Sequence, residues 1–514
     1  MSVGLWARGG APGARWSAWP ALLALAWAMA ACSGPAAPPA VSVASRPAPA
    51  TPPASIGVLA VLPLETAAGD ADARLFGDGM AMQLTNALAR VPGLGAISPE
   101  STFRLRGSSE LNSVMGGTLG ASHLLRGSLR RQDGALELQL ELVQTSDGGT
   151  LWSQHYQRVE RELFGLQDEV VAAVVSALHA QPAAKRGQDE RPPGRSLAAY
   201  EEVLRGDALI AQGDIFSTRQ AVEAYQRALA IDPAYAHAHA RLAQALIQQV
   251  VRFPLDEAGV RAATEQARRE AAAALKLAPD GAEAHQANAA WLGAVAGDPV
   301  AAMEEIRRAL TLRPGDASLL AMLAVRQIGF GQLQDAAESL RQALRSNPLS
   351  APTLYSLGSV YLGLADYPQA EHVLRQALEL EPGLPLAQAF LAMAVFQQNR
   401  TPEAVEIARR EPQALWRSYA LAMAYWANAE RARSDAELQV LIREHAGDAA
   451  TQIAGVYAQR DDRDAMFHWL DVARQTGDPG LAEIRYMPFV SRYADDPRFI
   501  ALARKLDLEP AGPK

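Results

Sequence analysis

Evenly spaced prolines constrain this 514-residue chain more than any other feature. They fall at Pro279, Pro314, Pro348 and Pro382, 34 or 35 residues apart, and Pro233 lies 46 residues before the first of them. Proline ends a helix because it lacks a backbone N–H and its ring clashes with the preceding turn. A fixed period of this length is typical of a solenoid built from small repeated units, and not of a single globular core.

Each unit between two prolines has the pattern of two helices joined by a tight turn. In residues 351–382, Gly358 and Tyr361 share an apolar face of the first helix, and Ala370 begins an apolar face of the second. Small residues such as Gly358 and Ala370 let two helices approach closely. A triplet at equivalent positions recurs in the second helices: Ala221/Tyr225/Ala228, Ala267/Ala271/Ala274, Ala302/Ile306/Ala309, Ala336/Leu340/Ala343 and Ala370/Leu374/Ala377.

These residues and their period resemble the tetratricopeptide repeat. The resemblance implies an α-solenoid over residues 196–508, with roughly seven or eight helix pairs. The surplus in the 46-residue gap is expected in the turn around residues 251–259. Beyond Pro382 the period weakens, as is typical of terminal repeats.

The first 54 residues have the layout of a targeting segment followed by a tether. Arg8 and Arg15 precede an apolar stretch shorter than the ~20 residues that a transmembrane helix needs, and the single cysteine, Cys32, follows it. This layout resembles a bacterial lipoprotein signal. The resemblance implies that residues 1–31 are removed and that lipidated Cys32 holds the protein at the outer membrane, facing the periplasm. Residues 32–54, rich in proline and alanine, are the expected tether. An ordinary cleaved signal or an uncleaved anchor is the alternative.

Residues 55–180 have the pattern of a small α/β domain. A strand is expected at residues 56–62, a helix at 73–91, and a hairpin over 123–143 with a tight turn at Asp133-Gly134. With the sequence HLLRGSLRRQDGALELQLELVQTSDGGTLWSQHY, this order of elements resembles the TolB-N-like (FlgO-type) domain, which in many bacterial proteins directly precedes tetratricopeptide repeats. Relatives often carry a nucleotide cyclase or a DNA-binding domain in front, where this chain has a signal and a tether, so neither activity is implied. Residues 181–195 are the expected linker.

No catalytic constellation stands out in the sequence. The motifs G-x-x-x-x-G-K-[ST], H-E-x-x-H, C-x-x-C and G-x-S-x-G are all missing. His237 and His239 lie two apart on an expected helix, so they point away from each other and cannot share a metal; both are expected at the surface or in the groove. We therefore expect no enzymatic activity, no cofactor and no metal site, although an unrecognised hydrolase or transferase site in the α/β domain stays an alternative.

Charge gives no sign of a nucleic-acid partner, because the net charge is −8. A basic patch does occur on the expected hairpin, at His123, Arg126, Arg130 and Arg131. We interpret it as a solvated strand face that Glu137 and Glu141 neutralise across the strands, in preference to an anionic ligand site.

A tetratricopeptide solenoid exposes a concave groove lined by its first helices, and peptides bind there. By resemblance, the predicted partner-binding residues of this groove are Trp291, Tyr355, Leu362, Met393 and Phe396, with His237, Gln244 and Val325 at further groove positions. Aromatic and methionine side chains are typical anchors for a partner. Packing between neighbouring repeats is the alternative for Trp291 and Phe396.

The sequence thus predicts a multidomain chain: a small α/β domain followed by an all-α tetratricopeptide solenoid. The predicted function is that of a non-enzymatic, envelope-anchored scaffold, with protein or peptide partners and a lipid anchor in the membrane. The alternative is a membrane-anchored signalling protein whose α/β domain senses a small ligand.

Overall fold

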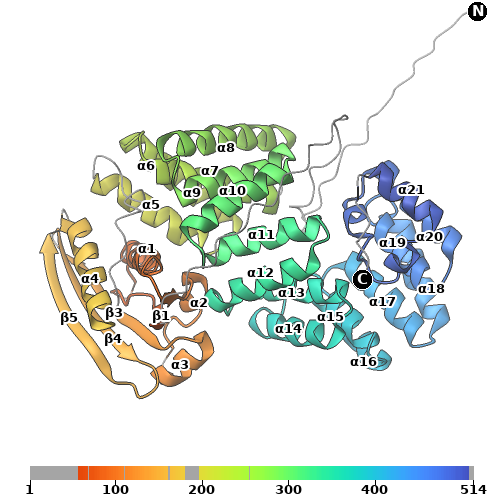
Figure 1. Ribbon diagram of the computed structural model, residues 1–514, viewed down its shortest axis with the longest axis horizontal. Helices are drawn as coiled ribbons and strands as arrows, with labels where there is room; N and C mark the ends of the chain where they lie inside the picture. The colour runs from red at the N-terminus through yellow and green to blue at the C-terminus, as the bar shows by residue number, and fades with distance from the viewer. Residues whose placement is uncertain are drawn as a thin grey trace, which may run out of the picture.

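A small α/β domain is followed by a long array of helix pairs (Figure 1). The computed structural model describes residues 56–506 and residue 508, except 68, 109, 133, 160–161, 180–195 and 254. The predicted signal with Cys32, the tether and the linker therefore lie outside the described residues. Within the described part of the chain, no helix has both the length and the apolar character needed to span a bilayer.

The α/β domain is built on a five-stranded mixed sheet with the strand order β2-β1-β3-β4-β5. β1 is parallel to β2 and to β3, while β4 is antiparallel to both β3 and β5. The strands are β1 Gly57–Val61, β2 Leu94–Ala96, β3 His123–Gln132, β4 Ala135–Gln144 and β5 Thr150–Val159. The predicted hairpin is confirmed, and Gly134 in its turn has a φ of 76°, a left-handed conformation that favours glycine.

Helices cover both faces of this sheet. α1 (Ala71–Leu88) and α4 (Leu163–Ala177) pack on one face, and α3 (Asn112–Leu119) packs on the other. Asp70 caps α1 by accepting a hydrogen bond from the backbone N–H of Ala73 at 2.9 Å. Sequence reasoning missed α2 (Pro99–Phe103), because five residues are too short to show a helical period.

The described helical array comprises eight helix pairs and a final helix, in agreement with the predicted number of pairs. The pairs are α5 Leu197–Ile210 and α6 Ile215–Ile231; α7 Ala236–Arg252 and α8 Glu257–Leu277; α9 Ala282–Trp291 and α10 Pro299–Leu312; α11 Ala317–Gly329 and α12 Leu333–Ser346; α13 Ala351–Gly363 and α14 Tyr367–Leu380; α15 Ala387–Phe396 and α16 Thr401–Ala408; α17 Ala414–Ala427 and α18 Arg431–His445; α19 Ala450–Gln459 and α20 Arg463–Thr476. The final helix is α21 Pro497–Lys505.

The close approach of the two helices in a pair follows from residue size. In the α13–α14 pair, a Cβ atom at Gly358 would lie 2.5 Å from Cγ of the fully buried Leu374. Many second helices also begin in the same way, with an aspartate that accepts a hydrogen bond from a backbone N–H of the first turn. These caps are Asp214, Asp256, Asp298, Asp366 and Asp462.

The expectation of a long turn at residues 251–259 is wrong. α7 continues to Arg252 and α8 begins at Glu257, so the turn between them is short. Instead both helices are long, with 17 residues in α7 and 21 in α8, against 13 in α13 and 14 in α14. Extending helices satisfies the backbone hydrogen bonds of the extra residues, which a long loop would leave to solvent.

The α/β domain and the first repeat share one hydrophobic core. The ring of Phe164 on α4 meets Tyr200 on α5 edge-on, with centroids 4.9 Å apart, and the Gln167 amide donates to the Tyr200 hydroxyl at 2.8 Å. A second contact joins α2 to the turn between α12 and α13, where the Ser101 hydroxyl donates to Oδ1 of Asn347 at 2.6 Å. The array therefore meets the α/β domain at two points that are far apart in the sequence.

Candidate binding groove

The first helices line the inner side of the array. Neighbouring first helices pack against one another, α13 with α15, α15 with α17 and α17 with α19, more closely than neighbouring second helices do. Because the first helices lie closer together, the array curves with these helices on its concave side. This concave surface is the candidate binding groove.

A segment of the same chain lies in this groove. We call residues 479–493 the groove segment; it follows α20 and precedes α21, and it begins and ends with short 3₁₀ turns, Pro479–Glu483 and Ser491–Tyr493. The Arg485 guanidinium donates to the carbonyl oxygen of Gly329 at the end of α11, 156 residues away in sequence. The Phe489 ring stacks on Phe396 of α15, with centroids 6.2 Å apart and an interplanar angle of 22°.

The groove segment passes close to glycines of the first helices. A Cβ atom at Gly363, the last residue of α13, would lie 2.9 Å from Cδ1 of Leu333 and at an ordinary contact distance of 3.4 Å from Cδ2 of Tyr486. At Gly455 on α19 it would lie 2.8 Å from Cε of Met487. Tyr486, Met487 and Phe489 are half-buried against the core of α11 to α19. The groove segment thus contacts first helices along much of the C-terminal half of the array.

A carboxylate of the groove segment, that of Glu483, lies near Tyr355 and Tyr419 of the first helices. Burial, and secondarily the charge of Asp478, raises the pKa of the Glu483 carboxyl to about 7. Burial and then the nearby Glu483 raise the pKa values of the Tyr355 and Tyr419 phenols. The Tyr355 hydroxyl is buried, and no hydrogen-bond partner for it occurs among the described residues.

Most of the predicted partner-binding positions are buried. Tyr355, Leu362, Met393 and Phe396 are only 4 to 6% exposed, and Phe489 of the groove segment stacks on Phe396. Trp291 is half-buried and packs against the cores of the first repeats. The structure therefore brings Tyr355 and Phe396 together with the groove segment and leaves Trp291 apart from it. Binding of a partner by any of these side chains stays a prediction.

A second polar cluster is buried in the first repeats. The Tyr225 hydroxyl and Nε of Arg241 both donate to Oδ1 of Asp207, at 2.8 and 2.6 Å. On the same helix as Arg241, His237 is 5% exposed, and burial lowers its pKa to about 3, so the ring is neutral. The expectation that His237 lies at the surface is wrong, because its side chain is buried next to Glu283 and Ala284 of α9. Its place in the groove stays a prediction.

The other histidine of the pair, His239, contacts Oε2 of Glu270 at 2.5 Å. In the part of the chain that the structure describes, no group of three or more His, Cys, Asp and Glu side chains is placed to hold a metal ion.

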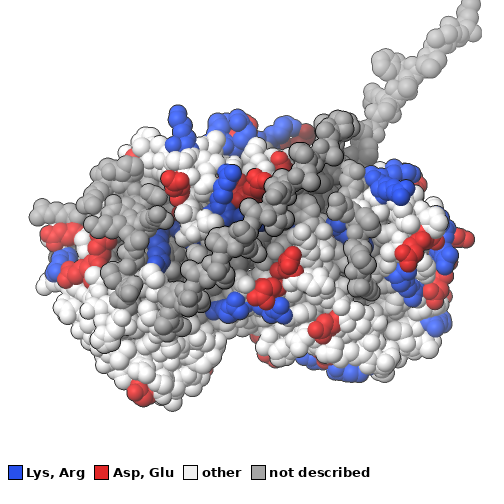
Figure 2. Space-filling model, in the orientation of Figure 1, with Lys and Arg blue, Asp and Glu red and all other residues white. Residues whose placement is uncertain are grey.

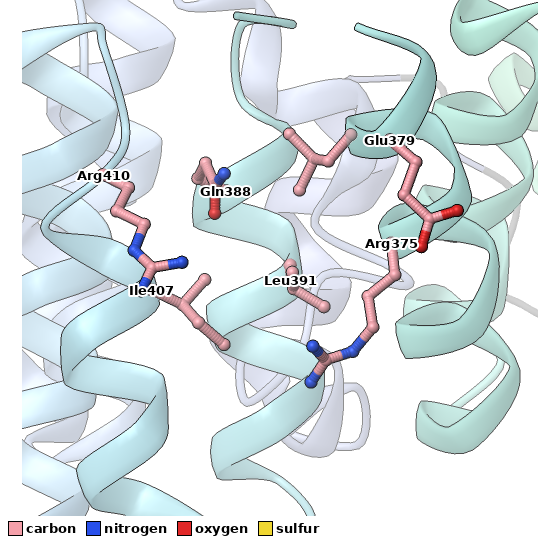
Figure 3. A pocket seen from close by; sticks show the side chains of 7 residues that line it. Arg375, Glu379, Gln388, Leu391, Ile407 and Arg410 are labelled. Atoms are coloured by element: carbon pink, nitrogen blue, oxygen red, sulfur yellow. The ribbon is translucent and has the colours of Figure 1, made fainter. Parts of the chain in front are cut away.

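The outer side of the array has a shallow pocket of about 240 Å³ between α14, α15 and α16. Figure 3 shows Leu391 on its floor, with Arg375 and Arg410 on opposite sides. Arg375 is already paired with Glu371 at 2.7 Å and with Glu403 at 2.9 Å. The volume is below the ~300 Å³ at which small-molecule sites usually begin. We assign no ligand to this pocket.

Surface charge is mixed. On the face that Figure 2 shows, basic and acidic side chains are interspersed over the helical array. On the β3–β4 hairpin, Arg126 pairs with Glu141 at 2.8 Å, and Arg131 pairs with Glu201 of α5 at 2.9 Å. The predicted neutralisation by Glu141 is confirmed.

Comparison with known protein families decides the class of the helical part. A model described as "TPR repeat" matches residues 206–250, and one described as "Tetratricopeptide repeat" matches residues 321–364 and 355–418. The helical array is a tetratricopeptide-repeat solenoid. Its period, its helix pairs and its small residues at helix contacts all agree with this class.

Individual relatives are distant from this chain. "Putative adenylate cyclase 3" of Rhizobium meliloti (strain 1021) is 31% identical over 204 residues, which is 39% of this chain and 34% of that protein. Pseudomonas aeruginosa pilF is 20% identical and matches 43% of this chain and 95% of its own, with a TM-score of 0.36. A thermophilic tetratricopeptide protein of Thermus thermophilus is 19% identical over 38% of this chain and 99% of its own, with a TM-score of 0.32.

Sequence reasoning missed the groove segment. Its signal is a set of large apolar residues without helical spacing, Ile484, Tyr486, Met487 and Phe489, which follow the last helix pair. Apolar residues in an irregular segment still need burial, so this composition indicates that the segment packs against something. The pattern does not show which surface it covers.

Proposed function

We propose that this protein is a non-enzymatic, envelope-anchored scaffold that binds partner proteins or peptide segments through the groove of its solenoid. The tetratricopeptide repeats carry this proposal, since such arrays present a concave surface to protein partners. The proposal adds an anchor and a location to that general role.

Anchoring is proposed from the N-terminal sequence. Cys32, the single cysteine of the chain, follows an apolar stretch with arginines before it, in the layout of a lipoprotein signal. A lipid on Cys32 would hold the folded part at the outer membrane, on the periplasmic side. Radiolabelled palmitate should enter the protein in cells and should fail to enter the Cys32→Ser variant. Equal labelling of the two chains, or no labelling of either, contradicts the anchor.

The α/β domain is proposed to be TolB-N-like. The support is the order β1, α1, β2, α3 and the β3–β4–β5 meander, together with the hairpin sequence quoted above. The Rhizobium meliloti relative bears the name of a cyclase, but the match spans about a third of its length, and we do not extend that activity to this chain.

The apolar stretch before Cys32 also allows a second candidate, in which it is an uncleaved anchor: a membrane-anchored regulatory protein whose α/β domain senses a small ligand in the cytoplasm. The two functions differ in the side of the membrane on which the folded domains lie. Alkaline phosphatase fused after residue 195 is active only outside the cytoplasm, so the scaffold proposal expects an active fusion and the regulatory one an inactive fusion.

Partner binding is tested by crosslinking in the native cell. A photoreactive phenylalanine analogue at half-buried Trp291, a predicted groove position on α9, should give adducts with a small set of proteins. The same analogue at Phe216, which is 67% exposed on α6, is the matched control. Identical adducts from both positions, or none from Trp291, contradict the scaffold function.

A further inference from the structure

The groove segment shows what kind of ligand the groove binds. This inference rests on the proposed scaffold function and names its ligand class. We propose that the groove over α11 to α19 recognises a short peptide in which a cationic side chain is followed by aromatic and aliphatic side chains. Residues 485–489, Arg-Tyr-Met-Pro-Phe, are an internal copy of this ligand. A partner peptide replaces them when it binds. We call residues 485–489 the tip of the groove segment.

The tip lies on the groove as a bound peptide would. No helix or strand includes it. Local backbone hydrogen bonds, such as those from the N–H groups of Tyr486 and Met487 to the Glu483 carbonyl oxygen, fold it into turns, and its side chains reach Gly329 of α11 and Phe396 of α15. On either side of the tip, Ile484 and Val490 are fully buried in a core with α19, α20 and α21, against which Met487 and Phe489 of the tip also pack. A partner peptide that replaces the tip therefore displaces Met487 and Phe489, while the flanking Ile484 and Val490 stay anchored.

The groove favours a cation at one end. Arg485 donates to the carbonyl oxygen of Gly329, at the C-terminus of α11, where the partial charge of a helix is negative. The helix terminus at Gly329 is thus complementary to a basic ligand.

Aromatic contacts supply the apolar part of the recognition. Phe489 stacks on Phe396, and Phe390 continues an aromatic row from Tyr355, at 5.4 Å, to Trp416, at 6.1 Å between centroids. The Tyr486 ring lies beside Gly363 and packs against the core of α11 to α19. Such rows of aromatic side chains are typical anchors for a bound segment.

With the tip in place, the groove keeps a polar group without a hydrogen-bond partner, and the tip side chains are only partly buried. The Tyr355 hydroxyl beneath it has no hydrogen-bond partner among the described residues, and Tyr486, Met487 and Phe489 stay half-buried. A buried polar group without a partner weakens an interface. A partner peptide with a polar group near Tyr355 would therefore gain a contact that the tip does not make.

A fluorescent peptide of residues 481–491 tests the inference by anisotropy titration against the full chain. In the Tyr486→Ser/Phe489→Ser variant the tip binds the groove less strongly, so this variant should bind the peptide about tenfold more tightly than the wild-type chain. The reason is that the apparent affinity for the peptide is proportional to the fraction of molecules whose groove is not occupied by the tip. A peptide with Arg485→Ala and Phe489→Ala should bind neither chain. Ile500→Ser, at an exposed position of α21, should behave as wild type.

Equal affinity of the wild-type chain and a folded tip variant overturns the inference. If the tip variant does not fold, hydrogen exchange of the wild-type chain decides: excess peptide should speed exchange at residues 485–489, and unchanged exchange overturns the inference. Crosslinked partners from Trp291 without any peptide binding would leave the scaffold function standing and remove this inference. Peptide binding without crosslinked partners would leave this inference standing and contradict the scaffold function.

Discussion

At the scale of single residues, side-chain volume decides how closely the two helices of a repeat approach. Gly358 and Leu374 show this most clearly, since the space that a methyl group would need at Gly358 is already filled by a side chain that is fully buried. Where such a neighbour cannot move, an added methyl group strains the core.

Gly358→Ala should therefore lower the free energy of unfolding by about 1–3 kcal/mol, because the added Cβ overlaps Leu374. Urea unfolding followed by circular dichroism measures the loss. Gly383→Ala is the matched control: nothing lies within 4 Å of a Cβ there, so we expect a change below about 0.5 kcal/mol. Similar losses in both variants would contradict a specific role for the Gly358–Leu374 contact.

Because of Glu483, the free energy of unfolding should fall as the pH rises, which is the opposite of the usual effect of a carboxyl group. Its folded-state pKa of about 7 is above the ordinary glutamate value of 4.5, so the folded chain holds a proton that the unfolded chain has released between these pH values. Stability is therefore lost as the pH rises from about 4.5 to 7. Tyr355, Tyr419, Tyr486 and Asp478 are the titratable groups coupled to this carboxyl.

Glu483→Gln should remove this loss, because glutamine has the same shape and no charge. Between pH 5 and pH 8, the wild-type chain should lose roughly 1–3 kcal/mol relative to the variant. Thermal unfolding at a series of pH values measures the difference. Glu444→Gln, at an exposed position, should follow the wild type at every pH. A parallel pH profile for Glu483→Gln and the wild type would show that Glu483 is not the group responsible.

At the scale of elements, several helices take their caps from other segments. α15 begins after Leu386, which has a left-handed φ of 66° and no side chain able to cap. Glu411, beyond the next helix, accepts hydrogen bonds from the backbone N–H groups of Leu386 at 3.2 Å and Ala389 at 3.3 Å. A distant carboxylate thus satisfies the free donors at this helix start.

Glu411→Ala should lower stability by roughly 1–3 kcal/mol, because it leaves these buried N–H groups without an acceptor. Hydrogen exchange should quicken first at the start of α15. Glu406→Ala, on the exposed side of α16 with only a local ion pair to Arg409, should have little effect on either measurement. Loss of protection spread evenly over the array would argue against a local capping role.

At the scale of the whole molecule, the α/β domain and the solenoid behave as one packed unit. Tyr200, Val203 and Leu204 of α5 are at most 1% exposed and belong to the core that α1 and α4 also form. At the second contact, the Asn347 amide donates to Glu100 at 2.6 Å while Ser101 donates to Asn347. The first repeat therefore depends on the α/β domain for the burial of its apolar surface.

A fragment of residues 196–508 should consequently exchange the amides of α5 much faster than the full chain does. Fully burying a large apolar side chain contributes about 1.5–3 kcal/mol, and the fragment loses cover over Tyr200, Val203 and Leu204. Amides of α17, far from the α/β domain, are the internal reference and should be unchanged. Equal protection of α5 in both proteins would mean that the first repeat is stable by itself.

The sequence determined the repeat, the number of helix pairs and the strands of the sheet. These features depend on patterns within about forty residues, such as the proline period and the alternation of Leu138 with Gln139, so local spacing is enough to predict them. Which helices form the inner side of the solenoid followed from the resemblance to tetratricopeptide repeats.

Only the tertiary structure decided what lies in the groove. Arg485 reaches Gly329 across 156 residues because the array curves until α11 and α19 border the same concave surface, and no local pattern encodes that curvature. Phe396 was predicted as a groove position from its place in the repeat, yet its ring stacks on Phe489 of a segment that shares no period with it. The repeat pattern specifies how neighbouring helices pack, while the overall bend of the array determines which distant segments meet.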